Sequence, residues 1–469
     1  MTALGEAVRA GDTEAVRTLL EGGADPNAPD GDGLPPLCAA VAAFAHEAAD
    51  VLVEAGADPD RVLPDGTTPL LRAVESGSPA VVSALLWSRD LPEPGERLPE
   101  AERARLLDAA RRWYGAGAEG ELRRLTGAAG PADVSSVEEE WCQVEQIALG
   151  GLVVRAGHGA VLSTLEQVFG VPVPLEELVA RAVRHTDSSH VDWSEAKFRL
   201  EDRLAEGSRE VVTALRHHPS PVHRRFAADW LLSRQWGLRA DAYPYAEEDR
   251  ELLAAWADVE PDPEVLAVVL WALTEQDVGH PRLGSIGLRY AGHPDPGVRV
   301  RAVDCLGRSD GPSMAAEYEA LRLLAGDPDD DVRYEAALSL LGAQQDVDAM
   351  YGVIRDLVRD PGSPLRLAAA ERLGESGDRT ADATDLLLSL LDADDTQTRM
   401  LGAYGLALRD HPDTPWAYAK AEELGPFHPS DHRGNNGLWD WEKRNRPAGP
   451  TAPDGGVVAA QGDGAQPPG

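Results

Sequence analysis

The chain has 469 residues, of which 44 are basic and 80 are acidic, so its formal net charge at pH 7 is −36. An acidic surface repels phosphate backbones and anionic lipid headgroups, which argues against nucleic acid and membranes as partners. The three cysteines, Cys38, Cys142 and Cys305, lie far apart, so neither a disulfide framework nor a thiolate zinc site is expected. Without a stretch of roughly 20 apolar residues or an N-terminal signal sequence, we expect a soluble cytoplasmic protein.

A four-residue motif occurs twice within the first 90 residues. Gly23-Ala24-Asp25-Pro26 returns as Gly56-Ala57-Asp58-Pro59, and apolar residues at helical spacing precede both copies. Glycine supplies the left-handed residue that ends a helix, and Asp-Pro turns the chain away. The pattern predicts three units of helix, turn, helix and loop in a domain over residues 1–90. Such a unit cannot bury its apolar face alone, so the units must stack.

The first region resembles the ankyrin repeat family through two segments, residues 19–27 and 65–70. In that family a Thr-Pro-Leu-His tetrapeptide opens the first helix of each repeat, and Thr68-Pro69-Leu70 matches it, although Leu71 replaces the histidine. The resemblance implies binding of other proteins through loop tips and first helices. It marks four partner-binding candidates, for which ordinary solvated surface is the alternative: Arg61, Leu63 and Asp65 on a tip, and Arg72 on a helix.

Residues 91–215 show no repeat that can be aligned, and we expect a helical connecting region. Apolar spacing favours helices over residues 102–113, 137–149 and 175–183. Arginine predominates over lysine among the basic residues, and alanine, glycine and proline are abundant, which is typical of a GC-rich bacterial genome.

Two motifs in the connecting region invite a chemical interpretation. Gly157-His158-Gly159 suggests a phosphate-binding loop, but Leu162 stands where a third glycine is needed, and no Gly-Lys-Ser/Thr follows. His185 and His190, with acidic residues nearby, are able in principle to bind a metal, but we expect a solvated loop there. We therefore predict no catalytic residue, metal or cofactor.

A second repeated pattern occupies residues 216–425, with a Pro/Asp-rich turn followed by Val-Arg and a helix of small residues. Its fullest copy is residues 329–342, where Val332, Ala336 and Leu340 form one apolar stripe. The aspartates at its start favour a helix N-terminus, where backbone N–H groups lack partners. A calcium loop is excluded because Val332 stands where the sharp turn needs glycine and Leu338 where the closing glutamate is needed.

This second region is similar to the HEAT repeat family in its short bacterial form, with further copies beginning at Asp295, Ser363 and Asp394. Residues 219–223 have a histidine at the arginine position, and residues 261–266 have a leucine. In the family, the recurring Asp and Arg residues form a ladder of hydrogen bonds between repeats. The resemblance implies this structural role for Arg299, Arg333, Arg366 and Arg399.

Beyond the repeats, residues 426–445 are expected to form a cap over the last repeat, and residues 446–469 a disordered tail without bulky side chains. His428 and His432 are four residues apart, but Pro429 argues against a shared helix face and hence against a metal site.

The predicted fold is an all-α helical-repeat solenoid, in which an ankyrin-like array is joined to a HEAT-like array. The predicted function is an intracellular scaffold without enzymatic activity that binds a protein or peptide, with basic partners favoured by the acidic charge. The alternative is a HEAT-type enzyme, lyase-like or modifying, whose catalytic residues are scattered along the sequence.

Overall fold

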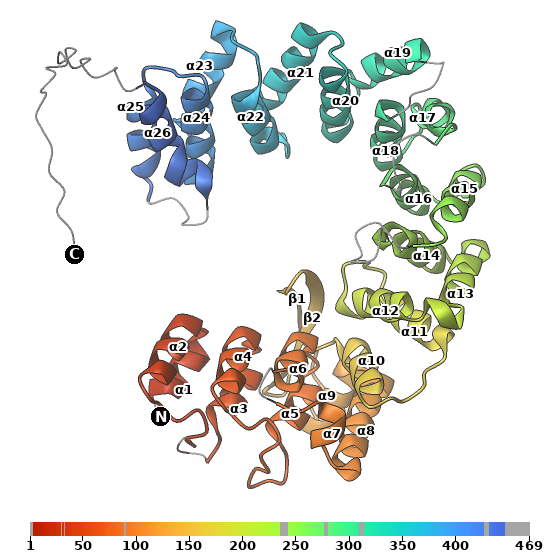
Figure 1. Cartoon of the computed structure of the whole chain (residues 1–469), viewed down its shortest axis with the longest axis vertical. Helices are drawn as coiled ribbons and strands as arrows, with labels where there is room; N and C mark the ends of the chain where they lie inside the picture. The colour runs from red at the N-terminus through yellow and green to blue at the C-terminus, as the bar shows by residue number, and fades with distance from the viewer. Residues whose placement is uncertain are drawn as a thin grey trace, which may run out of the picture. The chain divides into compact units, whose positions relative to one another are not determined.

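The structure of the protein is a computed structural model that describes residues 3–29, 31, 33–88, 91–234, 243–275, 280–308, 314–425 and 431–445. The chain forms two compact units, Met1–Val278 and Gly279–Gly469, which are described separately (Figure 1). The predicted tail and His428 lie outside the described residues. Within the described ranges no helix has the length and apolar character needed to cross a bilayer.

The first unit begins with three pairs of antiparallel helices. They are α1 (Ala3–Ala10) and α2 (Thr13–Glu21), α3 (Pro36–Ala42) and α4 (His46–Glu54), and α5 (Pro69–Ser76) and α6 (Pro79–Leu86). Local sequence sets their starts: Thr68 Oγ1 accepts a hydrogen bond from Leu71 N at 3.1 Å, and Pro69 occupies the first turn of α5.

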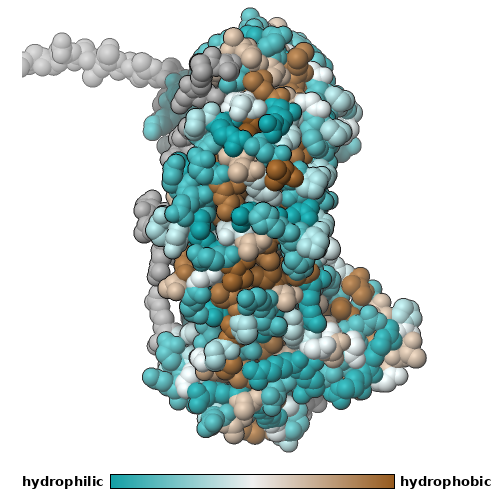
Figure 2. All heavy atoms as spheres, turned by 90° about the vertical axis from the view of Figure 1, so that its right-hand side faces the viewer, coloured by the Kyte–Doolittle hydropathy of each residue, from teal (hydrophilic) through white to brown (hydrophobic). Residues whose placement is uncertain are grey.

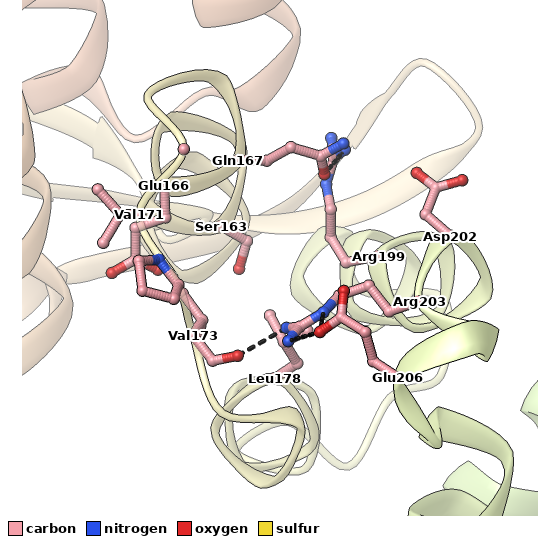
Figure 3. Close-up of a pocket in the computed structure, with 12 residues that line it drawn as sticks. Ser163, Glu166, Gln167, Val171, Val173, Leu178, Arg199, Asp202, Arg203 and Glu206 are labelled. Atoms are coloured by element: carbon pink, nitrogen blue, oxygen red, sulfur yellow. Dashed lines mark hydrogen bonds and ion pairs between the residues drawn. The ribbon is translucent and has the colours of Figure 1, made fainter.

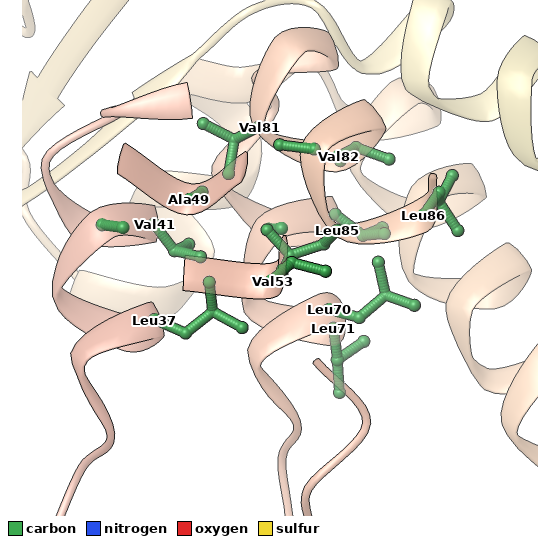
Figure 4. Close-up of a cluster of buried hydrophobic side chains, with 14 of the residues drawn as sticks. Leu37, Val41, Ala49, Val53, Leu70, Leu71, Val81, Val82, Leu85 and Leu86 are labelled. Atoms are coloured by element: carbon green, nitrogen blue, oxygen red, sulfur yellow. The ribbon is translucent and has the colours of Figure 1, made fainter. Parts of the chain in front are cut away.

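The helix pairs share one apolar core, in which leucine and valine side chains from successive pairs interdigitate (Figure 4). Leu37 and Val41 of α3, Leu70 of α5 and Leu85 of α6 are all buried. Each fully buried side chain of this size stabilises the fold by roughly 1.5–3 kcal/mol relative to an exposed one. Because each pair covers its neighbour, the core is continuous along the stack.

The connecting region contains helices and a small sheet. Its elements are α7 (Pro94–Arg97), α8 (Glu100–Ala116), α9 (Ala118–Thr126), β1 (Asp133–Glu139), β2 (Cys142–Leu149), β3 (Leu152–Arg155), α10 (His158–Val168), α11 (Leu175–Ala182) and α12 (Val191–Asp202). The helix predicted over residues 102–113 is confirmed within α8, and the one predicted over residues 175–183 is confirmed by α11, which ends one residue earlier.

The helix predicted over residues 137–149 is wrong, because these residues form most of an antiparallel hairpin. Glu140 reverses the chain with a φ of 55°, and Gly150 and Gly151, with φ of 60° and 86°, make a second two-residue turn. Val144 and Ile147 are three residues apart, a spacing that also occurs along one side of a helix. In the structure they lie on opposite faces of β2, and both are buried. The Gly-Gly pair between two apolar residues was the overlooked hairpin signal.

The sheet has the order β1-β2-β3, with both strand pairs antiparallel. On one face Ile147, Leu149 and Val154 pack with Trp113 and Leu122 of the helices. Nearer the β1–β2 turn, Val144 packs with Ala160 and Val191, from α10 and α12. Both clusters hold β2, whereas β1 lies at the edge.

The first unit ends with further helices: η1 (Leu204–Glu206), α13 (Ser208–Ala214), η2 (Leu215–His217), α14 (Pro221–Ser233), α15 (Ala246–Ala257) and α16 (Pro263–Glu275). Large buried side chains hold this part together. Trp193 of α12 meets Phe226 of α14 edge to face, with ring centroids 5.1 Å apart, and both are fully buried.

The second unit consists of helices in its described part. They are α17 (Leu283–Tyr290), α18 (Pro296–Gly307), α19 (Met314–Leu324), α20 (Asp330–Gly342), α21 (Val347–Arg359), α22 (Arg366–Glu375), α23 (Ala381–Leu390), α24 (Thr396–Leu408), α25 (Thr414–Glu422) and α26 (His432–Asn445). The predicted stripe of Val332, Ala336 and Leu340 is fully buried.

Small residues let helices of the second unit approach closely. A Cβ on Gly374 would lie 3.1 Å from the Cα of Gly405, so α22 and α24 meet at these two glycines. In the region expected to form a cap, α26 packs Leu438 and Trp441 against the core of this unit. The described chain thus has the predicted all-α repeat class, to which the three-stranded sheet is a local addition.

Candidate functional site

The four candidates from the ankyrin-like region lie in or beside the segment that joins α4 to α5. Leu63 is only 4% exposed, so its expected position on an exposed tip is wrong. Arg61 Nη1 donates to the carbonyl of Asn27 at 3.0 Å, which ties two successive loops together. Arg72 Nη2 lies 2.7 Å from Asp65 Oδ2.

Asp65 also organises its own turn. Its Oδ1 accepts hydrogen bonds from the hydroxyl and the backbone N–H of Thr67, at 2.6 and 3.0 Å. These bonds, with that of Arg72, lower the pKa of Asp65 to about 2. The polar candidates therefore hold the loop in shape, and a partner-binding role for them stays a prediction.

Arg299 connects two successive repeats of the second unit. It is the fourth residue after Asp295, which caps α18. Its Nε and Nη2 donate to the carboxylate of Asp327 at 2.9 and 2.7 Å, and Nη1 donates to the carbonyls of His293 and Pro294. Both partners of the ion pair are mostly buried, so the bidentate bond replaces lost hydration.

Arg224 makes the same set of contacts in the first unit and was missed in the sequence. It donates to both carboxylate oxygens of Glu260, and its Nη1 donates to the carbonyls of His218 and Pro219. Helix α14 has Ser220 as its N-cap residue, so Arg224 is again the fourth residue after the cap. When the repeat is aligned on Val222, His223 falls at the arginine position. The match to Arg224 lies one residue further along the chain.

The other three predicted ladder arginines differ in their contacts. Arg399 Nη1 donates to the carbonyl of Lys420 in α25, at 3.1 Å. Arg333 pairs with Asp330, which also accepts a hydrogen bond from the hydroxyl of Ser363 before α22. Arg366 Nε instead donates to a carbonyl of the preceding helix, α21. A structural role for the four predicted arginines stays a prediction that substitution tests.

A pocket of about 350 Å³ lies between the C-terminal ends of α10 and α12 and the segment that leads to α11 (Figure 3). Arg181 Nη1 binds Glu166 Oε2 at 2.7 Å and Ser163 Oγ at 2.9 Å, and all three residues are buried. At the rim Arg203 donates to the carbonyl of Val173. Among the residues that line this pocket, Glu166 pairs with Arg181, and the Ser163 hydroxyl donates to the carbonyl of Gly159.

Four titratable side chains meet where β2 approaches the turn before α12. His190 Nε2 lies 3.0 Å from Glu145 Oε2, and His185 Nε2 lies 3.3 Å from Asp192 Oδ2. The hydrogen bond from His190 lowers the pKa of Glu145 to about 2. His190 and Asp192 are buried, so the expectation of a solvated loop is wrong.

The donor atoms of Glu145, His185 and His190 lie within 4.8 Å of one another, close enough for a shared metal ion. However, Asp192 N donates to His190 Nδ1 at 3.1 Å, which places the proton of the neutral ring on Nε2, facing Glu145. The two imidazoles also stack, with centroids 3.4 Å apart, so their in-plane lone pairs do not converge. The geometry supports a set of hydrogen bonds that joins β2 to the start of α12, and it does not support a metal site.

The Gly-His-Gly motif has a packing explanation. A Cβ on Gly157 would lie 2.8 Å from the carbonyl oxygen of Gly77, and one on Gly159 would lie 2.3 Å from Asp192 Oδ2. His158 stacks on Trp113 with ring centroids 4.8 Å apart, and burial lowers its pKa to about 4. These glycines allow α10 to approach its neighbours and require no bound phosphate.

A second pocket, of about 300 Å³, is lined by α6, the β1–β2 turn, α10 and α12. It combines aromatic and acidic side chains with one cation, Arg199, which lies 5.0 Å from the centroid of the Phe198 ring. Trp87 and Phe198 are about half exposed at this pocket. Glu140 is exposed, while Glu195 accepts hydrogen bonds from Arg199 and Thr164. Arg199 already occupies the Phe198 ring and the Glu195 carboxylate, so a further cationic side chain would be favoured by Trp87 and Glu140.

Hydrophilic side chains cover most of the molecular face shown in Figure 2, with apolar side chains interspersed among them.

Comparisons with known proteins identify both kinds of repeat. The family model for ankyrin repeats (3 copies) matches residues 4–93, and the model for HEAT repeats matches residues 250–341 and 318–407. A comparison with curated proteins gives no match. Among solved structures, an engineered protein aligns over 87% of this chain and 99% of its own at 16% identity, but its TM-score of 0.37 carries no argument.

Proposed function

We propose that this chain, which carries ankyrin repeats over residues 4–93 and HEAT repeats over residues 250–407, is a scaffold that binds a basic protein or peptide in the cytoplasm. The observation that carries the proposal is the aromatic and acidic pocket beside the third helix pair, where Trp87 and Glu140 line the wall and Arg199 already lies over the ring of Phe198. Cys38, Cys142 and Cys305 form no disulfide bond, which is consistent with a reducing compartment.

The chemistry of the pocket supports a lysine or arginine side chain as the group that enters it. A cation beside an indole or phenyl face gains about 0.5–2 kcal/mol, depending on how far it is desolvated. Nearby carboxylates strengthen the attraction and accelerate encounter with a basic partner. The formal charge of −36 acts in the same direction over the whole chain.

The proposal takes the chain to be a binding protein and not an enzyme. In the cluster at β2, the His190 ring forms hydrogen bonds with the Glu145 carboxylate and the backbone N–H of Asp192. The Asp192 carboxylate accepts a hydrogen bond from the backbone N–H of Ala160. In the larger pocket, Ser163 Oγ donates to the carbonyl of Gly159 and accepts from Arg181. Neither arrangement presents an activated nucleophile to the solvent.

The test uses the full chain and two fluorescein-labelled peptides, one of alternating Arg and Ala and one of alternating Glu and Ala. We expect fluorescence anisotropy to show salt-sensitive binding of the basic peptide. Trp87→Ala should weaken that binding about tenfold, because it removes the aromatic face. Trp416→Ala is the matched control, since Trp416 is similarly exposed but lies on α25. Equal binding of the two peptides would contradict the proposal.

A further inference from the structure

The hairpin leaves one edge of strand β1 open. β1 pairs with β2 along its whole length, from Asp133 opposite Ala148 to Glu139 opposite Cys142. Within the described ranges, residues 133–139 have no other backbone hydrogen bond. Figure 1 shows the β1–β2 ribbon extending beyond the neighbouring helices of the first unit. An open strand edge is a template for one more strand.

The register determines which groups of β1 point outward. The two-residue turn is closed by Glu139 and Cys142, a pair that exchanges both of its hydrogen bonds, and such pairs alternate along an antiparallel ladder. The outward-pointing N–H and C=O groups therefore belong to three alternate residues of β1: Val134, Ser136 and Glu138.

Hydrogen bonds on the other side of β2 agree with this alternation. Gln143 N donates to the carbonyl of Ser189 at 2.9 Å, and Ala156 N donates to the carbonyl of Glu145 at 2.8 Å. Gln143 and Glu145 stand opposite Glu138 and Ser136, so both members of each of these pairs direct their backbone groups away from the hairpin.

The hairpin is anchored well enough to present this edge in a fixed position. Glu139, at the end of β1, accepts hydrogen bonds from the hydroxyl of Ser78 at 2.9 Å and from Ala80 N at 2.6 Å, and it pairs with Arg155. A strand that is already ordered loses little conformational entropy when a partner pairs with it.

Charge decides which occupant suits the edge. β1 and its turn contain four acidic residues and no basic residue, namely Asp133, Glu138, Glu139 and Glu140. A second copy of β1 would bring carboxylates close to carboxylates, which is destabilising across paired strands. A basic strand would instead form cross-strand ion pairs. Trp141, which is 94% exposed in the turn, offers an aromatic surface next to the same edge.

We propose that β1 accepts an extended basic segment of a partner protein as a fourth strand of the sheet. Lysine or arginine side chains at alternate positions share one face of a strand and would lie beside Glu138, while Asp133 lies on the opposite face. This inference rests on the proposed function and adds its binding mode, since Glu139, Glu140 and Cys142 of the hairpin also line the aromatic and acidic pocket. The turn at the end of β1 therefore also forms part of the pocket wall.

The experiment compares Ser136→Pro with Ser136→Ala in the full chain. Both variants lose the hydrogen bond between the Ser136 hydroxyl and Gln143, but only Ser136→Pro loses the outward N–H. Proline at that position leaves the ladder to β2 intact. With a fluorescein-labelled peptide of alternating Lys and Val, we expect Ser136→Pro to weaken binding about tenfold and Ser136→Ala less than about twofold, as the loss of one backbone hydrogen bond requires.

The outcomes separate this inference from the proposed function. If both Ser136 variants bind like the unchanged protein while Trp87→Ala weakens binding, strand addition is wrong and the basic-partner function stands. If a peptide of alternating Glu and Val binds as well as the basic one, both proposals are wrong. If neither of these two peptides binds while the peptide of alternating Arg and Ala does, strand addition alone is wrong. Self-association that Ser136→Pro abolishes, seen by sedimentation without peptide, would make a second copy the occupant and overturn the inference.

Discussion

The helical repeats and the β1–β2 hairpin differ in how their neighbours hold them. In α20, Val332, Ala336 and Leu340 are fully buried, because helices of other repeats cover that face. In β1, by contrast, most side chains are exposed and the backbone bonds to β2 alone within the described ranges. Repeated units stabilise one another, whereas an inserted sheet depends on a few close contacts at its base and keeps an edge open to a ligand.

A substitution at the contact between the sheet and the third helix pair should lower the free energy of unfolding the most. A Cβ on Gly77, where φ is +71°, would lie 2.0 Å from the carbonyl oxygen of Arg155. We expect Gly77→Ala to lower the free energy of unfolding by about 4 kcal/mol, from backbone strain and overpacking together. Urea denaturation measures this loss.

Gly56→Ala is the matched control, because Gly56 also has a positive φ, of +90°, but open space where its Cβ would lie. It should cost only about 1 kcal/mol, the price of the left-handed conformation. Similar losses at Gly77 and Gly56 would show that the sheet is not held by close packing at this point.

Removal of an arginine from the hydrogen-bond ladder between repeats should cause the next largest loss of stability. Arg299→Ala leaves the mostly buried carboxylate of Asp327 without its bidentate partner and is expected to destabilise the second unit by about 3 kcal/mol. Arg72→Ala removes a more exposed ion pair and should cost much less. Thermal unfolding followed by circular dichroism compares them, and a larger loss for Arg72→Ala would refute a structural role for Arg299.

The buried imidazole beside the sheet predicts a pH dependence. The pKa of His158 is about 4 in the folded protein, below its ordinary value, so the unfolded chain binds the proton first as the pH falls. The stability that this group contributes is therefore lost as the pH falls from about 6.5 to about 4. The free energy of unfolding should decrease by about 2 kcal/mol between pH 8 and pH 5. Urea titrations at both pH values should show a smaller difference for His158→Phe, and an unchanged difference would contradict the assignment.

The smallest effect is expected at the free end of the hairpin. Glu140 has a φ of 55°, a conformation that glycine adopts without strain. Glu140→Gly should therefore raise the free energy of unfolding by about 0.5 kcal/mol, after the greater freedom of glycine in the unfolded chain is deducted. Glu138→Gly, in the extended strand, should lower it, and chemical denaturation would contradict the turn geometry if both changes destabilise.

Local sequence was a good guide wherever the structure repeats locally. Thr68-Pro69 opens α5, Asp295 caps α18, and the apolar spacing of α20 identified its buried face. It failed where burial came from distant residues. Val144 and Ile147 lie on opposite faces of β2, each covered by a different set of helices, and their spacing resembled one side of a helix.

The candidate site shows the same division. Leu63 was expected on an exposed loop tip because Pro64, Asp65 and Gly66 follow it, but its side chain is buried. Arg224 was missed because the arginine position is counted from the helix cap and not from the preceding valine. Trp87, Glu140 and Phe198 are widely separated in sequence, and only folding brings them to one pocket.

The sequence by itself determined that this chain is built from two kinds of helical repeat, because caps, turns and apolar periodicity act over a few residues and recur in each unit. Only the tertiary structure decided that a sheet is inserted between them, that one strand edge stays open, and that aromatic and acidic side chains gather at its turn. These features depend on contacts between residues far apart in the chain, which local spacing does not record.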